Sequence, residues 1–140
     1  MHNRLHRAID ANLNRSREAL RVCEDITRFV LDDKQLTNAL KNIRHKISRI
    51  DVWAYCNTPI HSRNIKSDIG KKISFDKSKP KSIKSLFYNN IHRAQESIRS
   101  LEEFSKLVGT KSLHMASEFK ALRFKIYTIE KRAVKKLINI

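Results

Sequence analysis

The chain has 140 residues, and its 30 lysines and arginines against 14 aspartates and glutamates give a formal net charge of +16. This length suits a single domain with a real core, and the charge favours anionic partners such as nucleic acid, a membrane surface or phosphorylated small molecules. Only two glycines and two prolines occur, which argues against loop-rich and sheet-rich folds and predicts long helices.

The first predicted helix runs from Asn3 to Leu31. Apolar side chains at helical spacing cover more than half of its circumference, and Asn12 and Arg15 fall inside this apolar arc. An amide or guanidinium among apolar neighbours must find partners or cost about 1–3 kcal/mol. The acidic residues stand at the borders of the arc: Glu18 and Asp25 at one, Glu24 at the other.

A turn and a second helix follow. Asp32-Asp33-Lys34-Gln35 predicts a capping box in which Asp32 accepts hydrogen bonds from the first-turn amides. The second helix carries a narrow apolar seam from Leu36 to Ala54, and Asn57-Thr58-Pro59 ends it. A seam of this kind packs against the first helix as an antiparallel hairpin.

Residues 57–80 lose the helical period and form the predicted crossover. Between Asn57 and Leu86, eight basic residues stand against two acidic ones. Within the crossover, Asp68-Ile69-Gly70 places a carboxylate two residues before a glycine, an arrangement that suits either a metal or a phosphate approached by backbone amides. A turn capped by the Asp68 side chain is the more ordinary interpretation.

The third helix is expected from Lys81 to Val108, with Gly109 closing it in a left-handed cap. The fourth begins near Ser112 and ends in a basic, amphipathic tail.

An internal repeat relates the two halves of the chain. At a shift of 78 residues, Asn12, Arg15, Glu18, Arg21 and Glu24 fall on Asn90, Arg93, Glu96, Arg99 and Glu102, and at a shift of 79, Arg44 falls on Arg123. The sequence therefore predicts an all-α four-helix bundle, built from two pseudo-twofold-related helical hairpins joined by a long basic crossover loop. It forms one domain, 1–140, with repeat one at 3–56, the crossover at 57–80 and repeat two at 81–140.

The repeated arginines and carboxylates have two interpretations. They are either structural ion pairs, such as Arg15 with Glu18 at i,i+3, or a phosphate site built around the pseudo-twofold axis. For the second interpretation, the candidate catalytic residues are Glu18, Arg21, Glu96 and Arg99. The candidate phosphate or substrate residues are Asn12, Arg15, Arg63, Gly70, Asn90 and Arg93, and the candidate Mg²⁺ ligands are Glu24, Asp25, Asp68, Glu102 and Glu103.

Several other sites are not indicated. No Walker-type phosphate loop, dinucleotide fingerprint or zinc helix motif is present. Cys23 and Cys56 are expected to be reduced thiols of a cytoplasmic protein. No apolar run approaches the about 18 residues of a membrane span.

Three stretches resemble a known family. Asn12 to Asp32 (NLNRSREALRVCEDITRFVLD), the segment Ser62-Arg63 … Asp68-Ile69-Gly70, and His92 to Lys106 (HRAQESIRSLEEFSK) are similar to a helical domain at the amino terminus of some bacterial thiamine-phosphate synthases. The closing Leu122-Arg123, Tyr127 and Glu130-Lys131 also match. One departure is Asn64, where the family is expected to have an aspartate.

In that family the helical domain is thought to be an alternative hydroxymethylpyrimidine-phosphate kinase. The resemblance implies that this chain makes the diphosphate with ATP and Mg²⁺, and that a separate thiamine-phosphate synthase is a possible partner. It implies a kinase rather than a barrel-type synthase, because 140 helical residues provide no (β/α)₈ scaffold. The matching positions are Asn12, Arg15, Glu18, Arg21, Glu24, Asp25, Arg63, Asp68, Gly70, Arg93, Glu96, Arg99, Glu102 and Glu103.

Two alternatives stay open. The charge fits a nucleic-acid-binding helical module, although the few aromatic residues lie mostly at core positions and do not suggest a stacking platform. The wide apolar arcs fit a noncatalytic, ligand-binding or partner-binding bundle that forms a homodimer.

Overall fold

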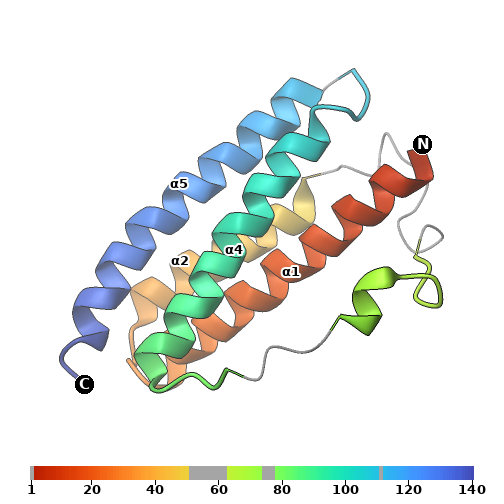
Figure 1. Ribbon diagram of the computed structural model, residues 1–140. Coiled ribbons are helices and arrows are strands. Elements are labelled where there is room, and N and C mark those ends of the chain that lie inside the picture. Colours follow the sequence, from red (N-terminus) through yellow and green to blue (C-terminus); the bar gives the residue numbers. More distant parts are fainter. Residues whose placement is uncertain (1, 51–62, 74–77, 111) are drawn as a thin grey trace.

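The computed structural model describes residues 2–50, 63–73, 78–110 and 112–140 (Figure 1). Four long helices pack side by side as a bundle, and the described residues contain no strand, which confirms the predicted all-α class. The helical elements are α1 (His2–Phe29), α2 (Lys34–Arg49), the short 3₁₀ helix η2 (Ile69–Lys72), α4 (Ile83–Ser105) and α5 (Ser112–Leu137).

The centre of the bundle is the contact between α1 and α4, which is the most extensive helix pair. The two helices run antiparallel, and Figure 1 shows the end of α1 beside the start of α4. The Cys23 thiol there lies 3.8 Å from the carbonyl oxygen of Phe87. Helix α2 packs on α1, α5 packs on α4, and a smaller contact between α2 and α5 closes the ring.

Apolar side chains from all four helices form one core. Full burial of such a side chain stabilises the fold by about 1.5–3 kcal/mol. The largest fully buried side chains include Phe87, Phe119, Leu20, Leu40 and Ile126. Cys23 is also fully buried, and burial raises the pKa of its thiol to about 12, so the free thiol stays protonated. Cys56 lies outside the described residues.

The sequence repeat is matched by a repeat of hydrogen bonds. Asn12 donates to the carbonyl oxygen of Ala8 at 2.8 Å, and its counterpart Asn90 donates to that of Leu86 at 2.9 Å. Each of these side-chain amides therefore makes one hydrogen bond within its own helix. Farther along, the hydroxyls of Thr27 and Ser105, again 78 residues apart, bond to the carbonyls of Glu24 and Glu102.

Each hairpin is also joined by the same buried ion pair. Glu24 of α1 is 4 % exposed and accepts hydrogen bonds from Arg44 of α2 at 2.8 and 3.4 Å. Glu102 of α4 is 2 % exposed and bonds to Arg123 of α5. In both copies a third residue, Arg21 or Arg99, contacts the same carboxylate from one turn away, at 3.3 and 2.8 Å. These residues therefore form ion pairs in both copies of the repeat.

The turn between α1 and α2 differs from the prediction. Asp33, not Asp32, caps α2, because its carboxylate accepts from the Leu36 amide at 2.9 Å. Asp32 instead adopts a left-handed conformation with φ of 49°, which aspartate tolerates better than most residues, and this residue reverses the chain. α1 consequently ends at Phe29 rather than at Leu31. Hydrogen bonds to the Leu36 amide and to Lys136 lower the pKa of Asp33.

Three other helix ends differ from the prediction. α2 ends at Arg49, where the expectation was Cys56, and the seam residue Ala54 lies outside the described residues. α4 begins at Ile83 behind a capping box formed by Ser82 and Ser85 and ends at Ser105. Gly109 has a positive φ of 66°, as predicted, but it follows an extra turn after the end of α4.

We predict that Glu102→Gln lowers the free energy of unfolding by about 1–3 kcal/mol, because Arg123 loses its buried carboxylate. Burial raises the pKa of Glu102, but hydrogen bonds from Arg123 and Arg99 outweigh it and hold the pKa below its ordinary 4.5. The difference in unfolding free energy between the unmodified chain and the variant is therefore largest above about pH 4.5. It shrinks as the pH falls through the lowered pKa of Glu102. Urea unfolding at several pH values measures this difference.

Glu103→Gln is the matched control, since the neighbouring Glu103 is about half exposed and pairs with Arg99 and Lys106 on the surface. A much smaller loss is expected for this variant. Equal losses in the two variants would contradict the role assigned to Glu102.

Candidate functional site

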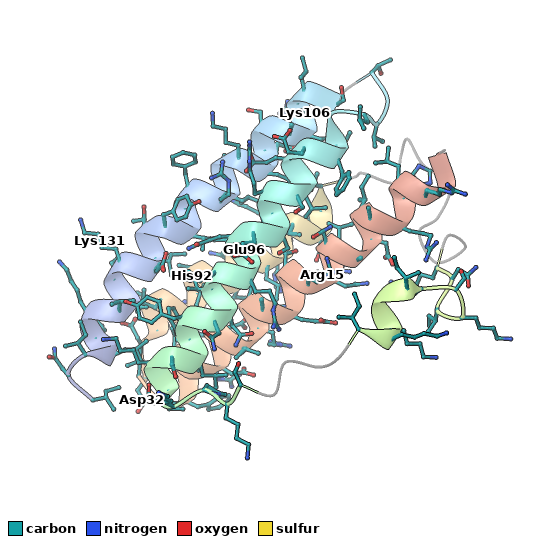
Figure 2. The ribbon with its side chains drawn as sticks, in the orientation of Figure 1. Arg15, Asp32, His92, Glu96, Lys106 and Lys131 are labelled. Atoms are coloured by element: carbon teal, nitrogen blue, oxygen red, sulfur yellow. The ribbon has the colours of Figure 1, made fainter. Side chains whose placement is uncertain are left out.

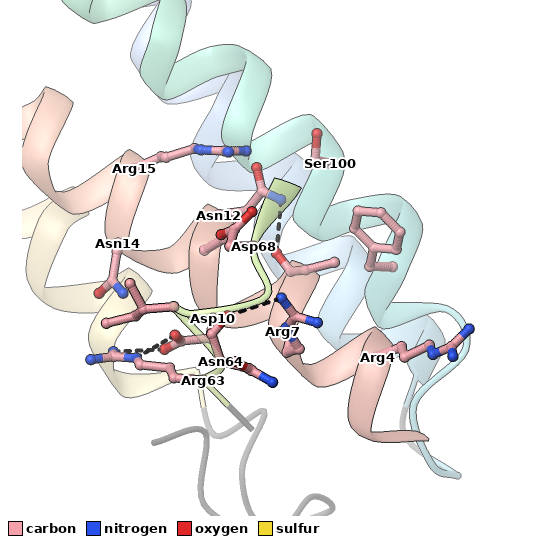
Figure 3. Close-up of a pocket in the computed structure, with 14 residues that line it drawn as sticks. Arg4, Arg7, Asp10, Asn12, Asn14, Arg15, Arg63, Asn64, Asp68 and Ser100 are labelled. Atoms are coloured by element: carbon pink, nitrogen blue, oxygen red, sulfur yellow. Dashed lines mark hydrogen bonds and ion pairs between the residues drawn. The ribbon is translucent and has the colours of Figure 1, made fainter. Parts of the chain in front are cut away.

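A cavity lies between the amino-terminal half of α1, the crossover residues 63–68 and the end of α4 (Figure 3). Its volume is about 710 Å³. Its charged lining residues are four arginines and two aspartates: Arg4, Arg7, Arg15, Arg63, Asp10 and Asp68.

An ion pair fastens the crossover to α1 at this cavity. Arg63 donates to both carboxylate oxygens of Asp10, at 2.6 and 2.9 Å, and Asp10 is only 6 % exposed. The bidentate geometry is the stronger form of an arginine–carboxylate contact. The hydrogen bond and the charge of Asp10 raise the pKa of Arg63 further above its ordinary value. Arg7 adds a longer hydrogen bond, 3.4 Å, to the carbonyl oxygen of Asn64.

Two side chains shape the crossover itself. Asn64 accepts from the Ser67 amide at 3.1 Å, and Asp68 accepts from the Gly70 amide at 2.9 Å as the cap of η2. Asp68 therefore has the ordinary capping role, through Oδ1, while no hydrogen bond to a described residue engages Oδ2. A Cβ at Gly70 would approach Asp68 Oδ1 to 3.2 Å, so glycine gives this turn its space.

Arg15 differs from what the apolar arc predicted. Arg15 is exposed, whereas Asn12 is buried. Its repeat partner Arg93 is also exposed. Both arginines lie at the border of the arc, and a long side chain there reaches solvent. Figure 3 shows Arg15 extending from α1 toward α4, where Ser100 lines the cavity. Arg15 makes no hydrogen bond or ion pair within the described residues, so its guanidinium is available to an anion.

The cavity thus brings together Asn12, Arg15, Arg63 and Asp68 from the predicted set, with Gly70 next to it in the η2 turn. The other predicted residues lie outside it. Figure 2 places Arg15 and Glu96 on the neighbouring helices α1 and α4. The exposed side chains Glu18, Asp25, Arg93 and Glu96 make no ion pair within the described residues. Glu24, Glu102, Arg21, Arg99 and Glu103 take part in ion pairs, and Asn90 bonds to its own helix.

Sequence reasoning missed Arg4, Arg7 and Asp10. At a shift of 78 these positions fall on Ser82, Ser85 and Tyr88, so the repeat gave no signal for them. The usable signal was a single carboxylate in a basic helical stretch. Asp10 follows Arg7 by three residues, a spacing that makes their side chains neighbours on the helix surface, and Arg7 follows Arg4 by the same spacing.

A preformed metal cage is absent from the described residues, because no three histidine, cysteine, aspartate or glutamate side chains gather there. Mg²⁺ is usually held by one or two carboxylates together with substrate phosphates. Asp68 with its second oxygen fits such a site. Asp10 does not, because Arg63 occupies both of its oxygens.

Comparison with known proteins decides the family. Residues 7–132 match the ThiD2 family, and this stretch includes every lining residue of the cavity except Arg4. The chain belongs to the ThiD2 family. No solved structure matches it. None of the described helices is long and apolar enough to cross a membrane.

Cyanobacterial thiamine-phosphate synthases are among its relatives. The chain is 35 % identical over 128 residues to the protein from Prochlorococcus marinus strain AS9601, and 34 % identical over 129 residues to that from Nostoc punctiforme. It is 36 % identical over 137 residues to the protein from Prochlorococcus marinus subsp. pastoris. These alignments cover 90–91 % of this chain but 34 % of each relative. The chain spans about a third of the length of these relatives.

We predict that Asp10→Asn releases the crossover from α1. Hydrogen exchange at the amides of Ser67, Gly70 and Ile73 should rise by roughly tenfold or more, because the variant loses a charge-assisted hydrogen-bond pair. The exchange of α4 and α5 should stay unchanged. Mass spectrometry of peptides covering 63–73 measures the effect, and unchanged exchange there would show that Arg63 does not hold the segment.

Proposed function

We propose that this chain is a kinase of thiamine biosynthesis that transfers the γ-phosphoryl group of ATP to hydroxymethylpyrimidine phosphate. The bond between the γ-phosphorus and the bridging oxygen breaks, a bond to an oxygen of the substrate phosphate forms, and ADP leaves. The family match and the thiamine-phosphate synthase relatives support the pathway. The observation that carries the activity is the cavity lined by four arginines.

The chemistry of this reaction suits such a cavity. The attacking atom is an oxygen of a phosphate that is already anionic, so a strong general base is less important than the neutralisation of charge. Phosphoryl transfer relies on positioned cations and an in-line arrangement of the two phosphates. Arg4, Arg7 and Arg15 come from one helix, and they line the cavity together with Arg63 of the crossover.

The arginines are not equivalent in this proposal. Arg63 is already paired with Asp10, so its main role is to position the crossover beside the substrate. Arg15 has no partner within the described residues and therefore binds phosphate directly. Asn12 keeps one amide hydrogen bonded to its helix, which leaves its carbonyl oxygen and second amide hydrogen for the substrate.

Mg²⁺, when bound with ATP, neutralises phosphate charge and aligns the two reacting groups. Asp68 is the residue that would hold it, through the oxygen that does not cap η2. This part of the proposal is independent of Glu24 and Glu102, whose carboxylates are occupied by arginines.

We predict that purified protein with Mg-ATP and hydroxymethylpyrimidine phosphate releases ADP and the pyrimidine diphosphate. Arg15→Ala should lower kcat/KM about a hundredfold, because a cation that stabilises the transferring phosphoryl group is lost. Helical content should not change, since Arg15 is exposed and unpaired within the described residues. Coupled ADP release, mass spectrometry of the product and circular dichroism measure these quantities.

Arg28→Ala is the matched control. This arginine is also exposed on α1, but it lies near the opposite end of the helix, over the ring of Phe29. It should retain the activity of the unmodified chain. Absence of the diphosphate product from the unmodified chain would refute the kinase proposal, and equal losses in both variants would remove Arg15 from the site.

Arg93→Ala tests the second half of the repeat. Arg93 is exposed, and it lies outside the cavity. Retained turnover in this variant would restrict the site to the cavity, whereas its loss would show that both halves of the repeat take part.

A further inference from the structure

A second basic site lies on the opposite side of the bundle, where α2 meets α5. Lys46 of α2 and Lys125 of α5 both line two neighbouring cavities, of about 340 and 320 Å³. Because α1 contacts α4 along one side of the ring and α2 contacts α5 along the other, this seam is separate from the arginine cavity.

The two lysines are partners in the repeat. Position 46 falls on position 125 at the shift of 79 that relates α2 to α5. The pseudo-twofold axis therefore passes between their side chains, and the fold brings two equal charges together. Both side chains line the same two cavities, and a hydrogen bond with Lys46, followed by the repulsion of its charge, lowers the pKa of the Lys125 amine.

The described residues that line the two cavities do not fully offset this charge. The charged groups that line the two cavities are Lys46, Lys125, Arg49 and Glu118. Glu118 is the single carboxylate among these described lining residues, and it lies 3.7 Å from His114 of its own helix. Neither lysine has an ion pair within the described residues. A bound anion between the lysines would turn their repulsion into two attractions.

The walls of the cavities indicate the size of the ligand. Beside the lysines they carry small and apolar side chains, including Ala39, Ile43, Ala121 and Ile129. A phosphate held between the lysines would have a small cavity on each side, with both apolar and polar walls. Cavities of about 340 and 320 Å³ suit a small organic phosphate better than a long polymer.

We propose that the α2–α5 seam is a second anion site, in which Lys46 and Lys125 bind the phosphate group of a small molecule. This site goes beyond the proposed kinase activity and does not depend on it. Free organic phosphates and the backbone of nucleic acid share this chemistry, and a direct comparison separates them.

The test uses methyl NMR with the full chain. Titration with inorganic pyrophosphate should shift the methyl signals of Ile43, Leu122 and Ile129, which line the two cavities. Lys46→Met and Lys125→Met should each raise the Kd for pyrophosphate, read from these methyl shifts, at least about tenfold, because a charge-assisted hydrogen bond is lost. The matched control, Lys120→Met, changes an exposed lysine of α5 outside both cavities and should respond as the unmodified chain does.

Pyrophosphate is also expected to bind the arginine cavity, so the titration is repeated with the Arg15→Ala variant. In this variant the methyl signals of the residues that line the α2–α5 seam should still shift. Unshifted methyl signals in the unmodified chain, or shifts that persist in the Lys46→Met, Lys125→Met double variant, would overturn the proposal. If a single-stranded oligonucleotide shifts these methyl signals and pyrophosphate does not, the proposal that the seam binds a small organic phosphate is overturned.

Discussion

The antiparallel packing of α1 against α4 is the constraint on which the rest of the structure depends. Cys23 lies beside Phe87, and Arg15 shares a cavity with Ser100, so the two helices run in opposite directions along their contact. Ser16 and Ala94 are repeat partners on these helices, and both are small and fully buried. The twofold relation between the two helices then fixes where each hairpin partner must lie.

This arrangement determines the path of the crossover. Because α1 and α4 are antiparallel, α2 and α4 run in the same direction, and the chain must return along the bundle to begin α4. The 16 residues of α2 alone span roughly 24 Å. A tight turn cannot cover that distance, so a long connection is required. Residues 63–68 of this connection lie against α1, and they complete the cavity there.

The polar residues of the repeat consequently separate into two groups. Those that face a hairpin partner, such as Glu24 and Glu102, are buried and saturated by arginines, because a buried carboxylate without partners is costly. Those that face outward, such as Arg15 and Arg93, have no partner within the described residues. Only one of this second group, Arg15, lies where the crossover encloses it. The symmetry of the sequence therefore does not by itself imply two equal sites.

Much of the fold was predictable, because helix formation and the apolar seams depend on local spacing. The number of long helices, their order and the repeat all follow from positions three and four apart and from the scarcity of glycine and proline. Helix ends were less predictable: the choice between Asp32 and Asp33 as the cap depended on a left-handed residue that no pattern marked. Arg15 was assigned to the apolar arc because a helical period gives an angle but not the reach of a side chain.

The sequence by itself determined that this protein is a basic helical bundle of two repeated hairpins, since amphipathic periodicity and self-similarity are properties of the chain alone. Only the tertiary structure decided which of the repeated charged residues form ion pairs inside the bundle and which face a cavity. It joined Asp10 to Arg63 across 53 positions and brought Lys46 beside Lys125. Such neighbours are created by the crossover path and by the twofold packing, and no local spacing encodes either of them.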